Sequence, residues 1–345
     1  MVALPTLETL IASAHVVSLP MRVKFRGVVS REVMVFAGPA GWSEFSPFVE
    51  YDDEESSRWL ASAIEAGWVG YPAAVRSTIP VNATVPAVSA AEVPDVLASF
   101  DAVHTVKIKV AEAGQSLAED AARVGAVRHV LPEAKIRIDA NGGWSVPQAV
   151  TALRMLNVFG LEYAEQPVAS IAELAAVRAA LQGSVLIAAD ESVRKATDPL
   201  AVARAGAADL IIVKAAPLGG VRRALEIVAE AGLPAVVSSA LDSSVGIRTG
   251  LGLAAALPEL PYACGLGTVS LMAGDVASPS LVAVGGGMEL REVVGDPELL
   301  ERFAAPAERQ QWWLERLRRC HALLATPNPA PPSENGGSGA GARGR

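Results

Sequence analysis

The stretches that decide the fold of this chain are KIRID (135–139), LEYAE (161–165), VLIAAD (185–190) and LIIVK (210–214). Each run ends in a charge, at Asp139, Glu165, Asp190 and Lys214, and successive charges lie 26, 25 and 24 residues apart. Such an interval accommodates one strand and one helix of a repeating βα unit, and short runs that are apolar on both faces are typical of buried parallel strands. Because βα loops gather at the carboxyl ends of such strands, the four charges are predicted to lie at an active-site rim.

The pattern continues on both sides of these runs. Alanine-rich helical segments such as VPQAVTALRMLNVF (146–159) separate most of the apolar runs. Eight alternating strands and helices favour a (β/α)₈-type barrel over an open sheet. The strands are expected around Pro80–Thr84, Val103–Val110, Lys135–Asp139, Leu161–Glu165, Val185–Asp190, Asp209–Lys214, Ala235–Ser238 and Tyr262–Leu266.

A second, smaller domain precedes the barrel. VKFRGVVSREVMVFAG (23–38) alternates and then turns at GPAG (38–41), as an antiparallel sheet does, and SRWLASAIEAGW (57–68) is predicted to be an amphipathic helix. The stretch from 24 to 48 is expected to close over the barrel mouth and exclude water. After Gly287 the chain is expected to return through a helix near Pro297–Leu317. We therefore predict a cap at residues 1–74 with 288–325 returning to it, a barrel at 75–287, and a disordered Pro/Gly/Ser-rich tail at 326–345.

Composition narrows the classes of function. The 345 residues are 51% apolar and 19% charged, which predicts a large buried core, and the net charge of −8 argues against nucleic acid as a partner. No uninterrupted apolar stretch has membrane-spanning length, and the N-terminus makes a poor signal peptide. Cys264 and Cys320 are the only cysteines, so a cytoplasmic location is the simplest expectation. The sequence leaves the oligomeric state open.

Strand alternation predicts which charges enter the barrel. Side chains of a strand alternate between its two faces, and the more apolar face suits the helix layer. In TVKIK (105–109), this places Lys107 and Lys109 inward, and in KIRID it places Arg137 and Asp139 inward. The complete inward set is Lys107, Lys109, Arg137, Asp139, Glu165, Asp190, Lys214 and Ser238.

The three inward carboxylates suggest a metal site. Asp139, Glu165 and Asp190 would repel one another unless a hard dication lay between them, and an oxygen-only ligand set favours Mg²⁺ or Mn²⁺ over zinc. For any one of these residues, a solvated strand end or a structural ion pair is an equally good interpretation. For the whole set this alternative is poor, because burying many charges for stability alone is costly.

Two other sequence features, an asparagine after the third strand and a Gly-Gly pair before a helix, each have two possible interpretations. Asn141 either supports the metal shell or forms the turn after the third strand. Leu218-Gly219-Gly220 precedes a helix, so it either binds an anion at the helix N-terminus or is a plain βα turn.

These residues resemble the enolase superfamily in its muconate lactonizing enzyme-like branch. The matching motifs are Lys107-Ile108-Lys109, IDANGGW with Asp139, AEQP with Glu165, ADES with Asp190, and Lys214. The resemblance implies a (β/α)₇β TIM-like barrel with an α+β capping domain and a small-molecule carboxylate as substrate. It also implies metal ligation by Asp139, Glu165 and Asp190, and catalysis by Lys109 and Lys214.

Within that branch, the chain is similar to the o-succinylbenzoate synthases, the dehydratases of menaquinone biosynthesis. The similarity rests on residues 24–48, on Arg137 two positions before the first metal ligand, and on SSALDSSVG (238–246) and CGLGTVSLM (264–272). Lys24 departs from the arginine common at its position, so no role is assigned to it. This similarity implies that the substrate contacts are Lys107, Arg137, Ser238 and Gly265. The implied reaction is syn elimination of water from 2-succinyl-6-hydroxy-2,4-cyclohexadiene-1-carboxylate.

Two other functions remain open from the sequence. The first is an N-succinylamino acid racemase, or another epimerase or cycloisomerase of the branch, because racemisation needs bases on both faces and Lys109 with Lys214 supplies them. The second is a non-catalytic, metal-dependent binder of succinyl acids. The pair of lysines argues against a binder, since binding alone needs no paired bases.

Overall fold

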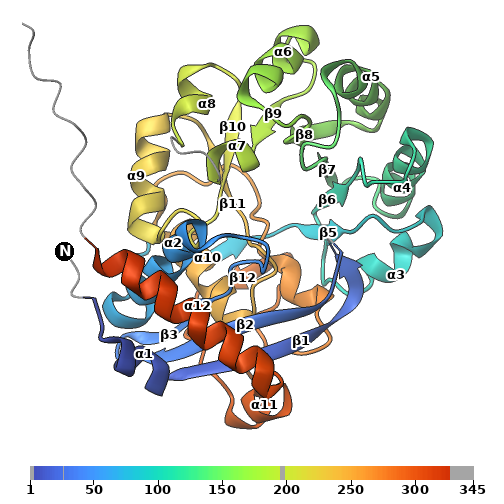
Figure 1. Ribbon diagram of the computed structural model, residues 1–345. Coiled ribbons are helices and arrows are strands. Elements are labelled where there is room, and N and C mark those ends of the chain that lie inside the picture. The colour runs from blue at the N-terminus through green and yellow to red at the C-terminus, as the bar shows by residue number, and fades with distance from the viewer. Residues whose placement is uncertain (1–3, 26, 195–198, 327–345) are drawn as a thin grey trace, which may run out of the picture.

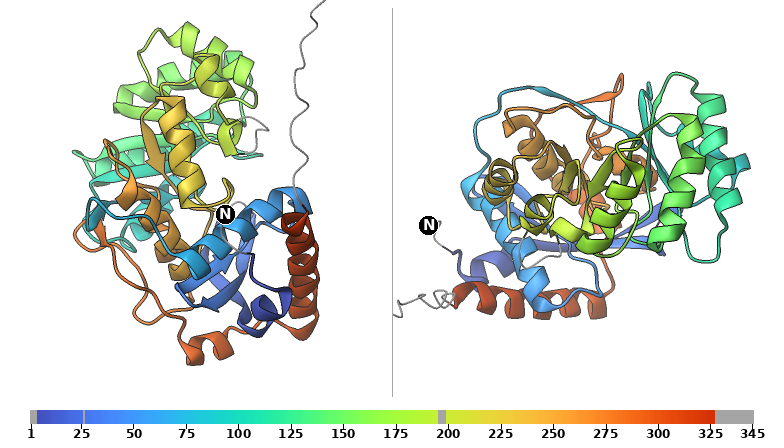
Figure 2. Two further views of the ribbon diagram at one scale, coloured as in Figure 1. Left: turned by 90° about the vertical axis from the view of Figure 1, so that its left-hand side faces the viewer. Right: turned by 90° about the horizontal axis from the view of Figure 1, so that it is seen from above.

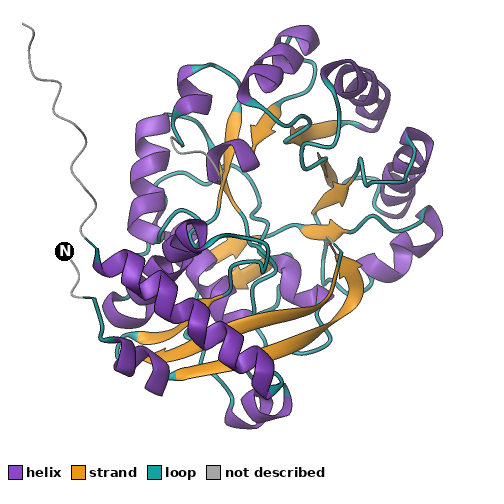
Figure 3. Cartoon of the chain, viewed as in Figure 1, coloured by secondary structure: helices purple, strands orange, loops and turns teal. Residues whose placement is uncertain are grey.

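Seven parallel strands form one sheet that curves around on itself (Figures 1 and 3). The computed structural model describes residues 4–25, 27–194 and 199–326. The strands follow one another across the sheet in chain order, which is the arrangement expected when each crossover returns the chain to the next position. They are β5 (Ala83–Val85), β6 (Thr105–Lys109), β7 (Lys135–Asp139), β8 (Leu161–Glu165), β9 (Ile187–Ala189), β10 (Leu210–Val213) and β11 (Ala235–Val237).

The eighth predicted strand, Tyr262–Leu266, contributes two single bridges instead of a strand. Cys264 pairs with Val81 next to β5, and Gly265 pairs with Ser238 next to β11, both in parallel. The two bridges join the two edges of the sheet. The predicted barrel is therefore confirmed, with its last strand reduced to the pairs that close it.

The first barrel strand starts later than its predicted range, Pro80–Thr84. Residues Thr78–Pro80 form β4, which pairs antiparallel with β12 (Gly287–Glu289). Val81 then makes the closing bridge to Cys264, and continuous barrel pairing starts at β5. The predicted range therefore overlaps the strand but starts too early, because an apolar run does not show that its first residue, Pro80, pairs with a distant segment.

Helices surround the barrel on its outside (Figure 1). Three successive helices start with a serine whose hydroxyl accepts from the third helical N–H, while the side chain three residues on bonds back to the serine. These pairs are Ser116–Glu119, Ser145–Gln148 and Ser170–Glu173. The elements between and directly after the barrel strands are η2 (Ala90–Glu92), α3 (Val93–Leu97), α4 (Leu117–Val130), α5 (Val146–Leu156), η3 (Asn157–Phe159), α6 (Ile171–Leu181), α7 (Glu191–Arg194), α8 (Ala201–Arg204), α9 (Val221–Ala231), α10 (Ser244–Ala256) and η4 (Gly267–Leu271).

A small apolar cluster fills the barrel separately from the main core. It consists of Tyr163, Ala188, Leu210, Ile212 and Val236, all at most 1% exposed. Each lies two or four residues before a polar residue of the predicted inward set. Since alternate residues of a strand share a face, the polar residues lie one step further toward the carboxyl ends of the strands. The barrel thus has an apolar floor beneath a charged rim.

The cap is an antiparallel sheet with helices on one side. Figure 2 shows the sheet between the barrel and the long helix α12 (Ala307–Ala325), which packs along α2. The predicted turn at 38–41 joins β2 and β3, and Gly38 lies so close to the Gly67 backbone that a side chain would not fit. The cap elements are α1 (Leu7–Ala12), β1 (Ala14–Phe25), β2 (Val28–Gly38), β3 (Gly41–Phe45), α2 (Asp53–Ile64) and the π-helical turn η1 (Glu65–Val69).

The returning segment is two helices, not the one predicted near Pro297–Leu317. Helix α11 (Pro297–Arg302) ends where Ala304 pairs with Val17 of β1, and α12 starts afterwards. Backbone pairing with the cap sheet therefore interrupts the helix. These contacts agree with a return to the cap, although the domain bounds at 74 and 288 stay predictions. The predicted disordered tail lies outside the described residues from 327 onward.

Candidate active site

Three carboxylates lie side by side at the carboxyl ends of adjacent barrel strands. Asp139 ends β7 and is the register partner of Glu165, which ends β8. Asp190 directly follows β9, the next strand. All three residues are 1% exposed. The strand alternation used for the sequence analysis therefore places these carboxylates together at one rim, as predicted.

Each carboxylate is engaged by a lysine. Lys109 Nζ donates to Asp139 Oδ2 at 2.5 Å, and Lys107 Nζ donates to both oxygens of Glu165 at 3.1 Å. Lys214 Nζ donates to Asp190 Oδ2 at 2.5 Å. Lys109 comes from β6 and Lys214 follows β10, four strands further around the barrel. The two lysines therefore face the carboxylates from opposite sides.

Charge is unevenly balanced within this cluster. Burial, with the neighbouring Asp139 and Asp190 carboxylates, raises the pKa of Glu165 to about 7. Burial opposes ionisation of Asp139 as well, but Lys109 and Lys107 hold the pKa of Asp139 below its usual range. Burial also lowers the pKa of Lys214, against the opposing effect of Asp190. Glu165 is thus the carboxylate whose negative charge the surrounding protein compensates least.

This donor set fits a hard divalent cation. Within the described ranges, no three carboxylate, imidazole or thiol side chains are arranged to hold a metal as they stand, because lysine ammonium groups lie between the carboxylates. Three buried carboxylates on adjacent strands, one of them with a raised pKa, nevertheless supply the oxygen ligands and the negative charge that such a cation requires. A cation bound here would take these oxygens from the lysines that now donate to them.

Two of the carboxylates and the three lysines surround a small cavity of about 30 Å³, and Glu165 does not line it. This volume holds about one water molecule, so a substrate enters only if lysine or cap side chains move. Phe25 and Phe48, near the two ends of the predicted lid, reach the cavity from the cap. The predicted residues that line it are Lys107, Lys109, Asp139, Asp190, Lys214, Ser238 and Gly265.

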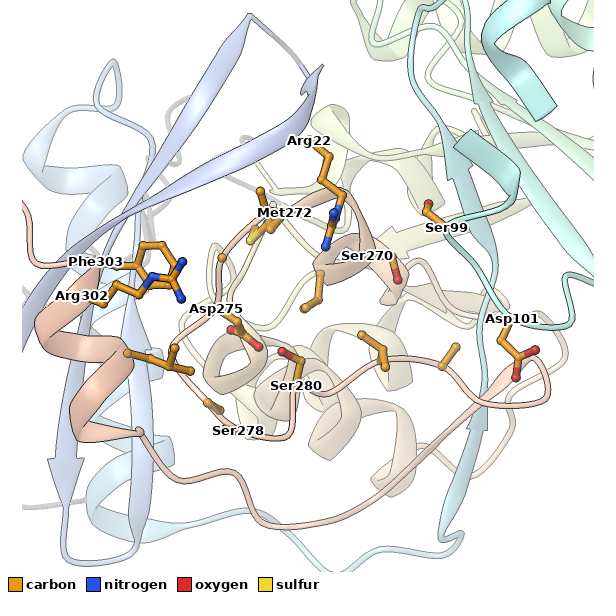
Figure 4. A pocket seen from close by; sticks show the side chains of 17 residues that line it. Arg22, Ser99, Asp101, Ser270, Met272, Asp275, Ser278, Ser280, Arg302 and Phe303 are labelled. Atoms are coloured by element: carbon orange, nitrogen blue, oxygen red, sulfur yellow. The ribbon is translucent and has the colours of Figure 1, made fainter. Parts of the chain in front are cut away.

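A larger cavity of about 650 Å³ lies elsewhere, between β1, η4 and α11 (Figure 4). Arg22, Ser270 and Arg302 project toward it, and none of the predicted site residues lines it. Its Asp275 carboxylate is engaged by the first turn of α10, through Ser244 N and Oγ. Volume alone therefore does not identify the candidate site, whereas the gathered charges do.

Arg137 lies inside the barrel but not at the cavity. Its Nε donates to Glu162 at 2.6 Å, and its Nη1 donates to the Ala263 carbonyl at 2.6 Å and to Asn82 at 3.2 Å. It is fully buried and stacks over Tyr163. Alternation predicted its face correctly, but Arg137 lies one layer below Asp139, so these contacts do not bring it to a substrate in the cavity.

Three residues at the site were missed by the sequence analysis. Gln166 accepts from the backbone N–H of Asp190 at 2.9 Å, and Arg194 Nε donates to the Asp190 carboxylate at 3.2 Å. Arg194 was detectable, because it follows Asp190 at the i,i+4 spacing of a helix. Arg31 of the cap donates to the Leu241 carbonyl at the cavity wall, and no local pattern signals this contact.

The structure also shows the contacts of Asn141 and of Leu218-Gly219-Gly220, the two features that had two interpretations each. Asn141 accepts from Lys109 Nζ at 2.6 Å, and its backbone is left-handed with φ 46°, so it both forms the turn and orients the lysine. At Leu218-Gly219-Gly220, the anion at the N-terminus of α9 is the cap residue Glu65. Its carboxylate accepts from Val221 N at 2.6 Å. This helix end therefore binds the cap.

Known proteins match the chain along most of its length. The family model for the enolase C-terminal domain-like fold matches residues 90–295, and the enolase N-terminal domain-like model matches residues 16–67. An o-succinylbenzoate synthase of Mycolicibacterium smegmatis is 56% identical over 93% of this chain and 98% of its own. One of Mycobacterium tuberculosis is 53% identical over 93% of this chain and 97% of its own.

Solved structures agree on the fold. A muconate lactonizing enzyme from Pseudomonas fluorescens superposes with a TM-score of 0.73 at 19% identity, over 85% of this chain and 98% of its own. The L-Ala-D/L-Glu epimerase from Bacillus subtilis superposes with a TM-score of 0.70 at 23% identity, over 82% of this chain and 96% of its own. Within the described residues, no helix combines the length and apolarity needed to cross a membrane.

Proposed function

This chain belongs to the o-succinylbenzoate synthases of the enolase superfamily, and on that premise we propose that Lys109 is the base with which it dehydrates 2-succinyl-6-hydroxy-2,4-cyclohexadiene-1-carboxylate. It is a metal-dependent carbon–oxygen lyase of menaquinone biosynthesis. The observation that carries the assignment of roles is the pair of buried lysines, each 2.5 Å from a carboxylate, on opposite sides of one cavity.

Asp139, Glu165 and Asp190 would hold the divalent cation, and we propose Mg²⁺, with Mn²⁺ able to replace it. The ligand set supports this choice, because all three donors are hard oxygens. A dication in this position supplies positive charge beside the substrate carboxylate, which favours loss of the very weakly acidic α-proton. The raised pKa of Glu165 is consistent with a site built to receive such charge.

Lys109 is proposed to perform both proton transfers. As a neutral amine it takes the α-proton, and the electron pair of the C–H bond moves toward the substrate carboxylate. The resulting ammonium group then donates its proton to the departing hydroxyl as the C–O bond breaks. One water molecule leaves and the ring becomes aromatic, which makes the overall step favourable. Syn geometry needs both transfers on one face, and one lysine accomplishes this.

Asn141 and Asp139 set the starting position of Lys109. Both accept from its Nζ, at 2.6 and 2.5 Å, and so hold the side chain at the carboxylate rim. Lys214 on the opposite side acts through its charge, stabilising the electron-rich carboxylate as the α-proton leaves. Lys107, Ser238 and Gly265 at the cavity wall are proposed to contact the substrate. A contact from Arg137 requires substrate to reach below the rim.

N-succinylamino acid racemisation is the second candidate activity. It is favoured by the placement of Lys109 and Lys214 on opposite sides of one cavity, and burial lowers the pKa of Lys214. A lysine with a lowered pKa opposite Lys109 is suited to transfer a proton at the second face. Lys214 therefore has the placement that a two-base reaction needs.

A single pair of assays tests the proposed function. Purified protein with Mg²⁺ is expected to consume the cyclohexadiene substrate in a spectrophotometric assay, with an N-succinylamino acid racemisation assay run beside it. Dehydration much faster than racemisation supports the proposal, and racemisation without dehydration would overturn it. A cytoplasmic location is part of the proposal and is supported by Cys264 and Cys320, both free thiols and buried.

A further inference from the structure

Arg31 on β2 is a buried cation of the cap that donates hydrogen bonds to backbone carbonyls. It is 3% exposed. Its Nε donates to the Leu241 carbonyl at 3.2 Å, and one Nη donates to the Ser46 carbonyl and, more weakly at 3.4 Å, to that of Ala240. The other Nη donates to the Glu32 carbonyl at 3.3 Å. One guanidinium therefore joins three separate backbone segments.

Two of these segments line the candidate active-site cavity. Ala240 and Leu241 belong to the loop after β11 and form part of its wall. Phe48 lies two residues after Ser46 and also lines the cavity, and its ring centroid is 4.4 Å from the Arg31 guanidinium carbon. Arg31 itself does not line the cavity. Arg31 thus lies behind the cavity wall, where it binds both the barrel loop at 240–241 and the cap segment at 46–48.

The barrel part of this wall needs external support. Leu241 has φ 61°, the left-handed conformation that side chains other than glycine rarely adopt. Such a conformation persists where surrounding contacts determine it. The contacts at this point are the bonds from Arg31 to the Leu241 and Ala240 carbonyls and the bond from Ala240 N to Asp242 at 3.2 Å.

We propose that Arg31 is a positioning residue for the dehydration, which fixes the loop 240–241 and the ring of Phe48 on two sides of the substrate. The proposal rests on the proposed function, because it concerns the walls of the same cavity. The hydrogen bonds of Arg31 go to backbone carbonyls and not to the lysines or carboxylates of the site. Its loss is therefore expected to weaken substrate binding more than it slows the chemical step.

Lysine does not replace arginine in this position. Guanidinium presents five N–H donors in a planar fork, whereas an ammonium group presents three donors from one atom. Carbonyls that approach Arg31 from the cap and from the barrel are reached together only by the fork, which also stacks on Phe48. Arg31→Lys keeps the charge and loses this geometry.

Arg128 on α4 offers a matched control. Its guanidinium also binds carbonyls, at Pro132, Ala134 and Phe159, with distances from 2.6 to 3.2 Å. These carbonyls lie near the amino ends of β7 and β8, away from the cavity. Arg128→Lys therefore makes the same chemical change without touching the cavity wall.

The test compares steady-state dehydration by wild type, Arg31→Lys and Arg128→Lys, with hydrogen exchange of the backbone amides at 239–242. For Arg31→Lys we expect KM to rise about tenfold or more while kcat falls less than about threefold, with faster exchange at 239–242. Arg128→Lys should change neither. Equal kinetics and equal exchange in the two variants would overturn the proposal. So would a fall in kcat with KM unchanged.

Arg31→Gln keeps the test valid if Arg31→Lys does not fold, because it places no compact ammonium charge in a buried site. It should show the same rise in KM. If both Arg31 variants are insoluble while Arg128→Lys is soluble, Arg31 is required for folding and the positioning proposal is wrong. Inactive wild-type protein would instead contradict the proposed function, and the hydrogen-exchange comparison would still decide whether Arg31 orders the loop.

Discussion

Lys109 donates to the Asp139 carboxylate at 2.5 Å, so the proposed base is paired with a proposed metal ligand. This pairing, together with the bond to Asn141, directs the Nζ of Lys109 at the rim and not at a substrate. A cation that binds Asp139 competes with Lys109 for the carboxylate. The base is therefore expected to become available only when the metal site is filled, and this coupling underlies the first prediction.

Removing divalent metal should abolish dehydration. Treatment with EDTA, followed by removal of the chelator, is expected to leave inactive protein whose activity returns with Mg²⁺ or Mn²⁺. Metal should also raise the thermal unfolding midpoint, because the three carboxylates are brought together only in the folded protein and a ligand that binds the folded state stabilises it. Asp209→Asn, on the outside of the barrel, is a control that should keep both responses. Full turnover by demonstrably metal-free protein would contradict this account of Asp139, Glu165 and Asp190.

Arg194 should tune metal affinity without ligating the metal. It is 2% exposed, and it orients Asp190 while its Nη1 donates to the cap residue Tyr51 at 3.1 Å. Outer contacts of this kind typically change metal affinity by about 10- to 100-fold. Arg194→Lys is therefore expected to weaken Mn²⁺ binding in calorimetric titration by about that factor. Arg178→Lys, which alters an ion pair with Asp209 outside the barrel, should leave the affinity unchanged. Equal affinities in the two variants would exclude this role.

Glu44 should make stability depend on pH. Burial and the nearby Asp242 raise the pKa of Glu44 to about 7, while Ser243, Ser46 and Arg31 oppose this effect. In the unfolded chain the carboxyl has its ordinary pKa of 4.5. The contribution of Glu44 to the free energy of unfolding is therefore fully present below pH 4.5 and is lost as the pH rises to about 7. The difference in unfolding free energy between wild type and Glu44→Gln should shift by about 3 kcal/mol across this interval, with wild type losing stability.

Chemical denaturation at several pH values measures this shift. Glu32→Gln is the control from the same sheet, because hydrogen bonds from Arg309 and Trp313 lower the pKa of Glu32 against the effect of burial. Glu32 therefore contributes to the free energy of unfolding at a pH above the ordinary carboxyl pKa, and this contribution is lost only as the pH falls below that value. A pH-independent difference between wild type and Glu44→Gln would show that Glu44 titrates normally.

The structure also shows what the sequence analysis determined and what it missed. Alternation along each strand identified the face of every inward charge, because that periodicity is local. Alternation does not show how deep in the barrel an inward side chain lies. Arg137 was predicted to contact the substrate, whereas it lies one layer below the rim that Asp139 occupies. Contacts between the cap and the barrel were not predictable either. Glu65 at the N-terminus of α9 and Arg31 at the Leu241 carbonyl join segments far apart in the chain.

Lys214→Arg should be severely impaired although it keeps a positive charge. Lys214 lies at 7% exposure against Asp190, and the larger planar guanidinium cannot take the position of its ammonium group. We expect kcat for dehydration to fall by about 10²-fold or more, because the charge no longer lies where negative charge develops on the substrate. Circular dichroism should show an intact fold. Near-normal kcat would mean that charge alone matters on this face.

Exchange with deuterated solvent distinguishes the two faces. For an N-succinylamino acid, Lys109→Ala is expected to retain α-proton exchange with only one enantiomer, the one whose proton faces Lys214. Lys214→Ala should retain exchange with the other enantiomer only. Nuclear magnetic resonance of each enantiomer in D₂O measures this directly. Exchange of both enantiomers by either variant would contradict the placement of the lysines on opposite faces.

The most direct measurement is the dehydration rate of Lys109→Ala with saturating Mg²⁺. Lys109 is proposed both to remove the α-proton and to protonate the leaving hydroxyl, and a positioned base contributes about 10²–10⁴-fold. We therefore predict that kcat/KM for the cyclohexadiene substrate falls by at least that factor, while the thermal unfolding midpoint shows a folded protein. Dehydration by Lys109→Ala at a near-wild-type rate would contradict the account and move the catalytic base to Lys214.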